Sequence, residues 1–126
     1  MEQLKVDRAE ILKYVKEKYK VDPDFPWSRT PKNAVLRHKD NSKWFALIID
    51  VQKKKLGLEG EDKVDIINVK CDPMLIGSLR TSEGYMPAYH MNKENWISIM
   101  LDGTVEKDEI CKLIDLSYNM TKDKLK

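Results

Sequence analysis

The sequence is poor in the residues on which metal centres, phosphate-binding loops and cross-links depend. Its 126 residues include only two cysteines, two histidines and five glycines. Cys71 and Cys111 lack metal-ligand spacing, and the chain has no glycine-rich phosphate loop, nucleophile elbow or His-Glu metal helix. No stretch approaches the roughly 20 apolar residues that a membrane helix needs. The sequence therefore contains none of the usual signatures of a metal, nucleotide or membrane-spanning site.

Signals for secretion and for a second domain are also missing. The chain shows no signal peptide, and two cysteines in different elements are typical of reduced thiols in the cytosol. No repeat, low-complexity tract or linker divides the sequence, so residues 1–126 are expected to form a single domain. We expect a cytoplasmic monomer with no cofactor, no metal and no membrane partner.

Charge of one sign is scarce as well. The chain has 23 basic and 21 acidic residues, a net charge of +2, whereas a protein held to nucleic acid by its overall charge is far more basic. The charge is uneven along the chain: residues 1–40 contain ten basic and seven acidic groups, and residues 81–126 contain six and eight. Any binding of phosphate must therefore depend on a local basic patch.

What is present is a regular succession of helix and strand patterns. Capping residues and apolar periodicity predict helices that start after Asp7 and Asp72, and a third over about 105–120. Strands are expected at 34–37, 44–51, 64–69, 87–91 and 96–101, with a projecting polar loop at 52–62. The first three strands are too close together for parallel crossovers. The fold class is therefore α+β, in the order α-β-β-β-α-β-β-α, with an antiparallel sheet and helices on one face.

Several short motifs occur together in this framework and extend over nearly the whole chain. They are Phe25-Pro26-Trp27, Lys43-Trp44-Phe45-Ala46, Val69-Lys70-Cys71-Asp72-Pro73, Leu79-Arg80, Tyr89-His90-Met91-Asn92-Lys93 with Trp96, Leu101-Asp102-Gly103 and Ser117-Tyr118. With the element order, this set resembles the MmcQ/YjbR-like family. One departure is Glu106, where many relatives have proline; it loosens a helix cap.

The resemblance implies a frataxin/CyaY-like fold, also compared with a double-wing DNA-binding domain, and it implies DNA as a partner. It brings no catalytic residues. An iron site like that of the frataxin-like fold would need an acidic first helix, but the first helix here is basic, with Lys13, Lys16, Lys18 and Lys20 against Asp7, Glu10 and Glu17. An enzyme would have to use His90 as a base, and nothing in the sequence places a partner beside it. We therefore expect a non-catalytic protein.

The loop from Tyr89 to Trp96 is the main candidate for binding. On a functional interpretation Lys93 pairs with a phosphate, while His90 and Asn92 reach a base edge and an aromatic side chain stacks. On a structural interpretation Asn92 caps the turn, Trp96 packs in the core and His90 only satisfies internal hydrogen bonds. Both interpretations are open from the sequence alone.

Other cations extend this candidate site. Lys43, Lys70 and Arg80 would join the loop in one basic face near the start of the middle helix, or they are simply solvated charges. The lysines at 53–55 are either a wing that touches a phosphate backbone or a solvated turn. Cys71 is expected to be a small buried residue. The leading hypothesis is DNA binding through Lys43, Lys70, Arg80, His90, Asn92 and Lys93. The alternative is a protein-interaction or small-anion-binding module with the same fold.

Overall fold

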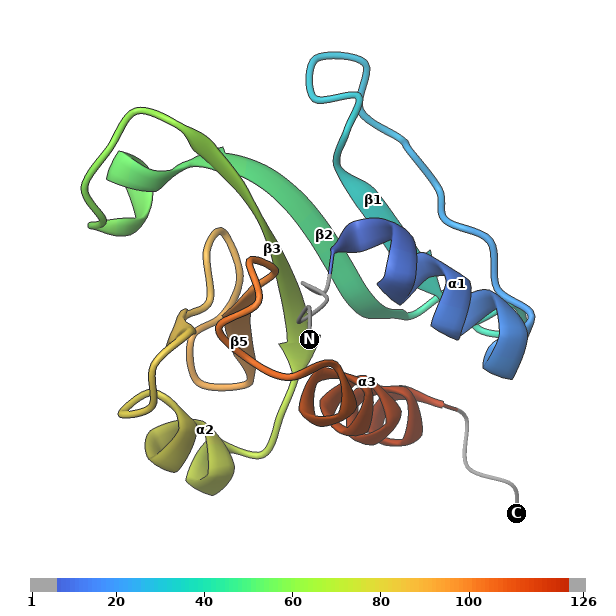
Figure 1. Ribbon diagram of the computed structural model, residues 1–126. Coiled ribbons are helices and arrows are strands. Elements are labelled where there is room, and N and C mark those ends of the chain that lie inside the picture. The colour runs from blue at the N-terminus through green and yellow to red at the C-terminus, as the bar shows by residue number, and fades with distance from the viewer. Residues whose placement is uncertain (1–6, 123–126) are drawn as a thin grey trace, which may run out of the picture.

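A computed structural model describes residues 7–122, which form a five-stranded sheet and three α-helices (Figure 1). All neighbouring strands are antiparallel, in the order β1-β2-β3-β5-β4. The elements are α1 (Arg8–Tyr19), β1 (Ala34–Arg37), β2 (Trp44–Gln52), a 3-10 turn η1 (Lys53–Leu56), β3 (Lys63–Lys70), α2 (Pro73–Leu79), β4 (Tyr85–Pro87), β5 (Trp96–Met100) and α3 (Lys107–Thr121). The predicted fold class and element order are confirmed.

Local capping explains where two of the helices begin. The side chain of Asp7 accepts a hydrogen bond from the backbone N of Glu10, and that of Asp72 accepts one from Met74. Both residues satisfy backbone donors that the first helical turn leaves without partners. Glu106, at the N-cap of α3, makes no such side-chain bond. Helix starts were therefore readable from the sequence where a cap is present.

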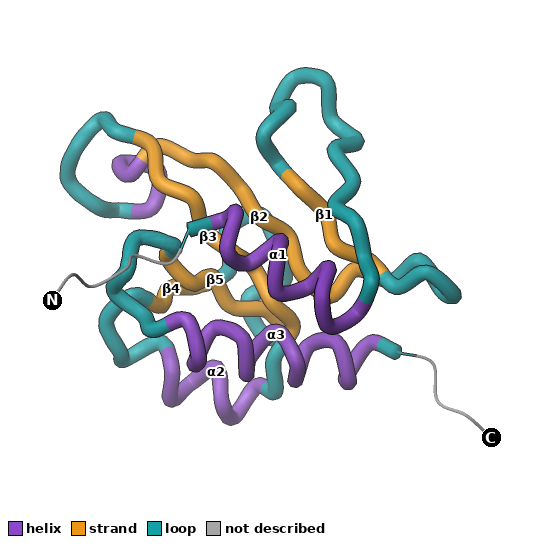
Figure 2. The backbone as a smooth tube through the Cα atoms, turned by 45° about the vertical axis from the view of Figure 1, so that its right-hand side comes forward, coloured by secondary structure: helices purple, strands orange, loops and turns teal. Residues whose placement is uncertain are grey.

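The three helices lie together against one face of the sheet (Figure 2). Alternation along the strands gives this helix-covered face Ile48, Ile67 and Ile97, which pack with Ile11 of α1 and Ile114 of α3. All five side chains are fully buried. The helix-covered face therefore contains the principal core.

The opposite face of the sheet, which we call the open face, is covered by loops and by no α-helix among residues 7–122. It contains a second apolar cluster built from Val35, Leu47, Ile49, Val51, Val64, Ile66 and Met100. Partly buried side chains from the surrounding loops cover it, including Leu56 and Leu58 from the β2–β3 hairpin and Tyr89 and Met91 from the β4–β5 loop. The open face is therefore built by loops that reach over a buried apolar surface.

One predicted strand is displaced. Extended structure was expected at 87–91, but β4 is Tyr85–Pro87, and Tyr89 and His90 form a turn. The reason is tertiary: two buried polar side chains of neighbouring strands hold Tyr89 through both of its backbone groups, as described below. The hairpin loop at 52–62 projects as expected, and a backbone hydrogen bond of 2.9 Å from Lys53 N to Asp62 O closes its base (Figure 1).

Candidate nucleic-acid interface

The turn that contains His90 is fixed to the sheet by a buried polar group. Asn68 of β3 and Ser98 of β5 are register partners and are both fully buried. The Asn68 amide donates to the carbonyl of Tyr89 at 2.9 Å, and the Tyr89 N–H donates to Ser98 Oγ at 2.9 Å. Ser98 Oγ in turn donates to Asn68 Oδ1. Because each buried polar atom has a partner, this group holds the β4–β5 loop in one position.

His90 follows directly and takes a backbone conformation that is unusual for its residue type. Its φ is +62°, in the left-handed region, and its side chain is exposed. The imidazole lies against the ring of Tyr89, with 4.0 Å between centroids. Left-handed backbone outside glycine persists where the surroundings impose it, which is the case beside the anchored Tyr89. The fold thus presents an imidazole at the surface of the open face.

Asn92 has the structural role that the sequence offered as an alternative. Its Oδ1 accepts from the backbone N of Glu94 at 2.8 Å and of Asn95 at 3.2 Å, which closes the turn before β5. The adjacent Lys93 is exposed, with no ion-pair partner within residues 7–122. Trp96 is half-buried opposite Lys70 and belongs to neither core cluster. His90 and Lys93 of this loop have exposed side chains, whereas Asn92 is engaged in the turn.

A hollow of about 340 Å³ opens beside His90 on the open face. Two tryptophans that meet edge-on line it, Trp27 and Trp44, with ring centroids 5.8 Å apart and planes at 79°. The remaining lining is Thr30, Asn33, Leu47, Ile49, His90 and Met91. Apolar walls with a few polar groups are typical of ligand sites, whose volumes are roughly 300–1,000 Å³. We call this feature the tryptophan hollow.

Three of the predicted lysines share one end of the sheet, near the tryptophan hollow. Lys43 directly precedes Trp44 at the start of β2, and Lys70 ends the neighbouring β3. Lys93 lies in the turn before β5, whose first residue pairs with Lys70. Because the strands are antiparallel, the start of β2, the end of β3 and the start of β5 coincide. The structure therefore brings Lys43, Lys70 and Lys93 to the same end of the sheet.

Arg80 lies elsewhere. It follows the last residue of α2, while Lys70 lies before its first residue, so the seven-residue helix stands between them. Ile76 of α2 packs into the core on the helix-covered face. At about 1.5 Å of rise per residue, α2 carries the chain roughly 10 Å away from Lys70. The structure does not bring Arg80 to the open face beside His90.

A smaller hollow of about 190 Å³ adjoins the tryptophan hollow, and both are lined by Thr30 and Asn33. The cations around the smaller hollow are Arg29, Lys32 and Lys63, and its one carboxylate is Asp50. Lys63 Nζ lies 3.8 Å from Asp50 Oδ2, whereas Arg29 and Lys32 have no ion-pair partner among the residues that the structure describes. Cations outnumber carboxylates in this hollow, which favours an anion. Lys32, Asp50 and Lys63 also line a neighbouring hollow with the ion-paired Arg8 and Asp65.

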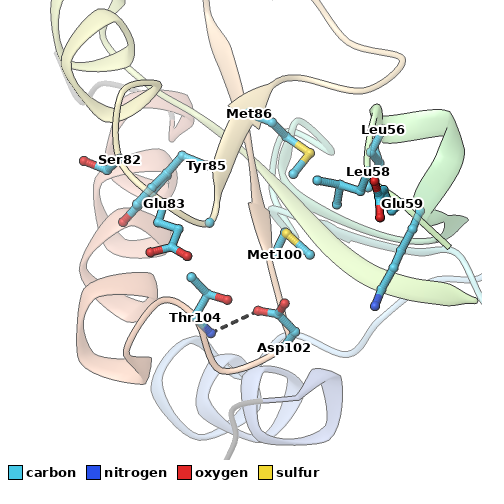
Figure 3. Close-up of a pocket in the computed structure, with 12 residues that line it drawn as sticks. Leu56, Leu58, Glu59, Ser82, Glu83, Tyr85, Met86, Met100, Asp102 and Thr104 are labelled. Carbon is cyan, nitrogen blue, oxygen red and sulfur yellow. Dashed lines mark hydrogen bonds between the residues drawn. The ribbon is translucent and has the colours of Figure 1, made fainter.

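A third hollow, of about 480 Å³, has the opposite character (Figure 3). Met86 and Met100 line its middle, and Leu56 and Leu58 of the β2–β3 hairpin line one side. Its lining includes the carboxylates Glu59, Glu83 and Asp102, and one cation, Lys53. Like charges near a phosphate are unfavourable. This acidic hollow therefore limits the part of the surface on which an anionic chain can lie.

A hydrogen-bonded group around one carboxylate joins α1 to α3. Asp115 of α3 accepts from Tyr14 Oη at 2.7 Å and from Tyr19 Oη at 2.5 Å, and Lys18 Nζ lies 2.8 Å away. Burial raises the pKa of this carboxyl, but the bonds from Lys18 and the two tyrosines outweigh burial, so the pKa lies below its usual range. Burial likewise raises the pKa of the Cys71 thiol. Cys71 is thus a small buried residue, as expected.

No group of three or more His, Cys, Asp or Glu side chains among residues 7–122 is arranged to hold a metal ion. No helix in the same range combines the length and apolar character needed to cross a membrane.

Sequence reasoning missed the wall that Trp27 forms with Trp44, and the cations Arg29 and Lys32. Seventeen positions separate the two tryptophans, and only the path of the 24–33 segment along β1, through an isolated bridge between Asp24 and Val35, brings them together. The sequence holds one signal: Trp27 follows a proline in a segment without helical or strand periodicity, a pattern that gives it no core position.

Comparison with known proteins places the chain in a family. A family model described as YjbR matches residues 5–120. An uncharacterised Bacillus subtilis protein, YyaQ, is 49% identical over 115 residues, which cover 91% of this chain and 98% of that protein. A crystal structure of a Pseudomonas syringae protein is 45% identical with a TM-score of 0.90, covering 92% of this chain and 99% of that one. A Deinococcus radiodurans structure with 21% identity and a TM-score of 0.73, covering 98% and 84%, has the same fold. The chain belongs to the YjbR family.

Proposed function

We propose that the protein is a non-catalytic, monomeric DNA-binding protein that uses the open face of its sheet. The observation that supports this most directly is the position of the tryptophan hollow, which lies along β2 between two sets of cations. At one end are Lys43, Lys70 and Lys93, and at the other are Arg29 and Lys32. At about 3.3 Å per residue, β2 from Trp44 to Asp50 spans roughly 20 Å. A backbone path of several nucleotides fits that length.

Local charge replaces overall charge in this proposal. A net charge of +2 cannot hold a polyanion, but separated lysines and arginines without ion-pair partners can each neutralise one phosphate. Aromatic and apolar side chains between them would contact bases. The exposed Lys54 and Lys55 of the projecting β2–β3 hairpin would touch the backbone like a wing, while the acidic hollow repels it. We expect modest affinity and strong dependence on salt.

Charge reversal tests which face binds. Lys70→Glu and Lys93→Glu should each weaken binding of a labelled DNA and reduce the slope of log K against log salt by about 1. Glu94→Lys, in the same turn, should strengthen binding. Lys112→Glu on the exposed surface of α3 makes the same charge change on the helix-covered face and should have no effect, nor should Arg80→Glu. Binding unaffected by all five variants, or no binding at low salt, would refute the proposal.

The mainly apolar lining of the tryptophan hollow also favours a second function, a protein-interaction or small-anion-binding module. An apolar side chain of a protein partner could fill the space between Trp27, Trp44 and Met91. A small anion would instead occupy the hollow beside Arg29 and Lys32. Under this alternative, inorganic phosphate or a peptide would bind with the same affinity whether or not competing DNA is present.

A further inference from the structure

Within the proposed function, on which this inference rests, we infer that the ligand is single-stranded DNA with one unpaired base in the tryptophan hollow. A duplex with its bases stacked does not supply that group. The inference assigns a base-binding role to Trp27 and Trp44 and a phosphate-binding role to the cations beside them. It gives no role to Arg80.

The walls of the hollow suit a planar aromatic ligand. Trp27 is 36% exposed, although it is among the largest apolar side chains, and Trp44 is half-buried against the open-face cluster. Their edge-on arrangement leaves ring surface available beside Leu47 and Met91, which line the same space. Every base has a π-face, so stacking on such a surface tolerates any sequence. Thioether sulfur also makes favourable contacts with aromatic rings.

Polar groups at the rim match the edge of a base. Asn33 Oδ1 accepts from the backbone N of Asp50 at 3.0 Å, which fixes the side chain and leaves its NH₂ group without a partner among residues 7–122. Thr30 and the exposed His90 add a hydroxyl and an imidazole. A base offers both donors and acceptors on its edge, and an isolated apolar side chain offers neither. This polar rim favours a base over a side chain of a protein partner.

Each tryptophan has a cation close to it in the sequence. Lys43 directly precedes Trp44, and Arg29 lies two residues after Trp27; both cations are exposed, and neither forms an ion pair with any residue between 7 and 122. A nucleotide in a strand has one phosphate on each side of its base. Cations beside both walls therefore match one base and its two flanking phosphates, with Lys32 available to the next phosphate along the adjoining hollow.

The preference for single-stranded DNA follows from the free energy needed to bring a base into this hollow. A base in a duplex must be unstacked and unpaired before it can enter a side pocket, whereas an unpaired base enters without that cost. Loss of one base–aromatic stack lowers affinity by roughly 5- to 150-fold. We therefore expect a preference of the same order for a single strand over a duplex of equal length.

The decisive experiment is a fluorescence-anisotropy titration of the full chain with three labelled DNAs of equal length: oligothymidine, a duplex, and a strand with abasic sites in place of bases. Wild type should bind oligothymidine best. Trp44→Leu keeps an apolar side chain but removes the ring, so it should weaken oligothymidine binding at least 5-fold and leave abasic binding unchanged. Arg29→Ala should weaken both. Trp96→Leu removes a ring outside the hollow and should leave the preference for oligothymidine over the abasic strand unchanged; circular dichroism of each variant checks folding.

The outcomes separate this inference from the proposed function. Equal binding of duplex and oligothymidine, unaffected by Trp44→Leu, would overturn the base-binding role and leave DNA binding by the open face in place. Binding of none of the three DNAs at low salt would overturn both. If Trp44→Leu proves unfolded, Trp44→Phe should retain part of the preference for oligothymidine over the abasic strand; full retention would contradict the inference.

Discussion

Replacing Ser98 by alanine removes one buried oxygen atom from the group that holds the His90 turn. That oxygen accepts from Tyr89 N at 2.9 Å and donates to Asn68 Oδ1, so the substitution leaves two groups without partners. Each buried group left without a partner costs about 1–3 kcal/mol. The cost for the Tyr89 N–H lies at the lower end of that range, because Tyr89 is half-buried and its N–H can bind water. We predict a loss of about 3 kcal/mol, equivalent to a fall in Tm of about 10 °C.

Urea unfolding measures the loss, and native-state hydrogen exchange locates it. The amide of Tyr89 should lose protection beyond the fall in global stability, because its acceptor is gone. The loosened turn should also weaken DNA binding, since His90 and Met91 line the tryptophan hollow.

Ser117→Ala is the matched control. Ser117 is equally buried and also makes two bonds, from Lys70 N at 2.9 Å and to Phe45 O at 2.5 Å, but it belongs to α3. It should destabilise the protein similarly without specific exposure of Tyr89. The reasoning is refuted if Ser98→Ala changes the free energy of unfolding by less than about 0.5 kcal/mol, the range of ordinary surface substitutions.

Two further predictions concern stability. In the folded protein the pKa of Asp115 is lowered, because its bonds with Lys18 and Tyr19 outweigh the effect of burial. These bonds contribute about 1–2 kcal/mol to the free energy of unfolding above the unfolded-state pKa of about 3.9. That contribution is lost as the pH falls through the folded-state pKa. Urea unfolding of Asp115→Asn should thus show a deficit at neutral pH that shrinks below about pH 4; a constant deficit contradicts it. Gly84→Ala should lose about 1–3 kcal/mol, because φ is +91° and the new Cβ would lie 2.6 Å from Val105 Cγ2. A thermal melt at or above the wild-type Tm would be inconsistent with that clash.

Local signals account for the parts of the fold that were predicted from the sequence. Asp7 and Asp72 cap the helices that follow them. The strand predicted at 64–69 forms as β3, with Ile67 and Val64 in different core clusters. The prediction of a strand at 87–91 was wrong because the conformation of this segment depends on Asn68, which lies about twenty positions earlier in the chain. No local pattern reports such a contact.

The sequence predicted only part of the candidate site, because local patterns do not report contacts between residues that are distant in the chain. The loop with His90 was found because unusual residue types cluster there, and Lys43, Lys70 and Lys93 prove to share one end of the sheet. Arg80 was grouped with these lysines because it is close to Lys70 in the sequence. That closeness is misleading, because α2 lies between the two residues. Trp27 and Arg29 were missed because their segment has no periodicity and finds its place only through contact with β1 and β2.

The most direct test of DNA binding by the open face is a nitrogen-15 NMR titration with oligothymidine at low salt. The indole N–H signals of Trp27 and Trp44 and the amides of His90 and Met91 are predicted to shift together, while the amides of α1 and α3 stay in place. Shifts confined to the helix-covered face, or no shifts at all, would contradict the account.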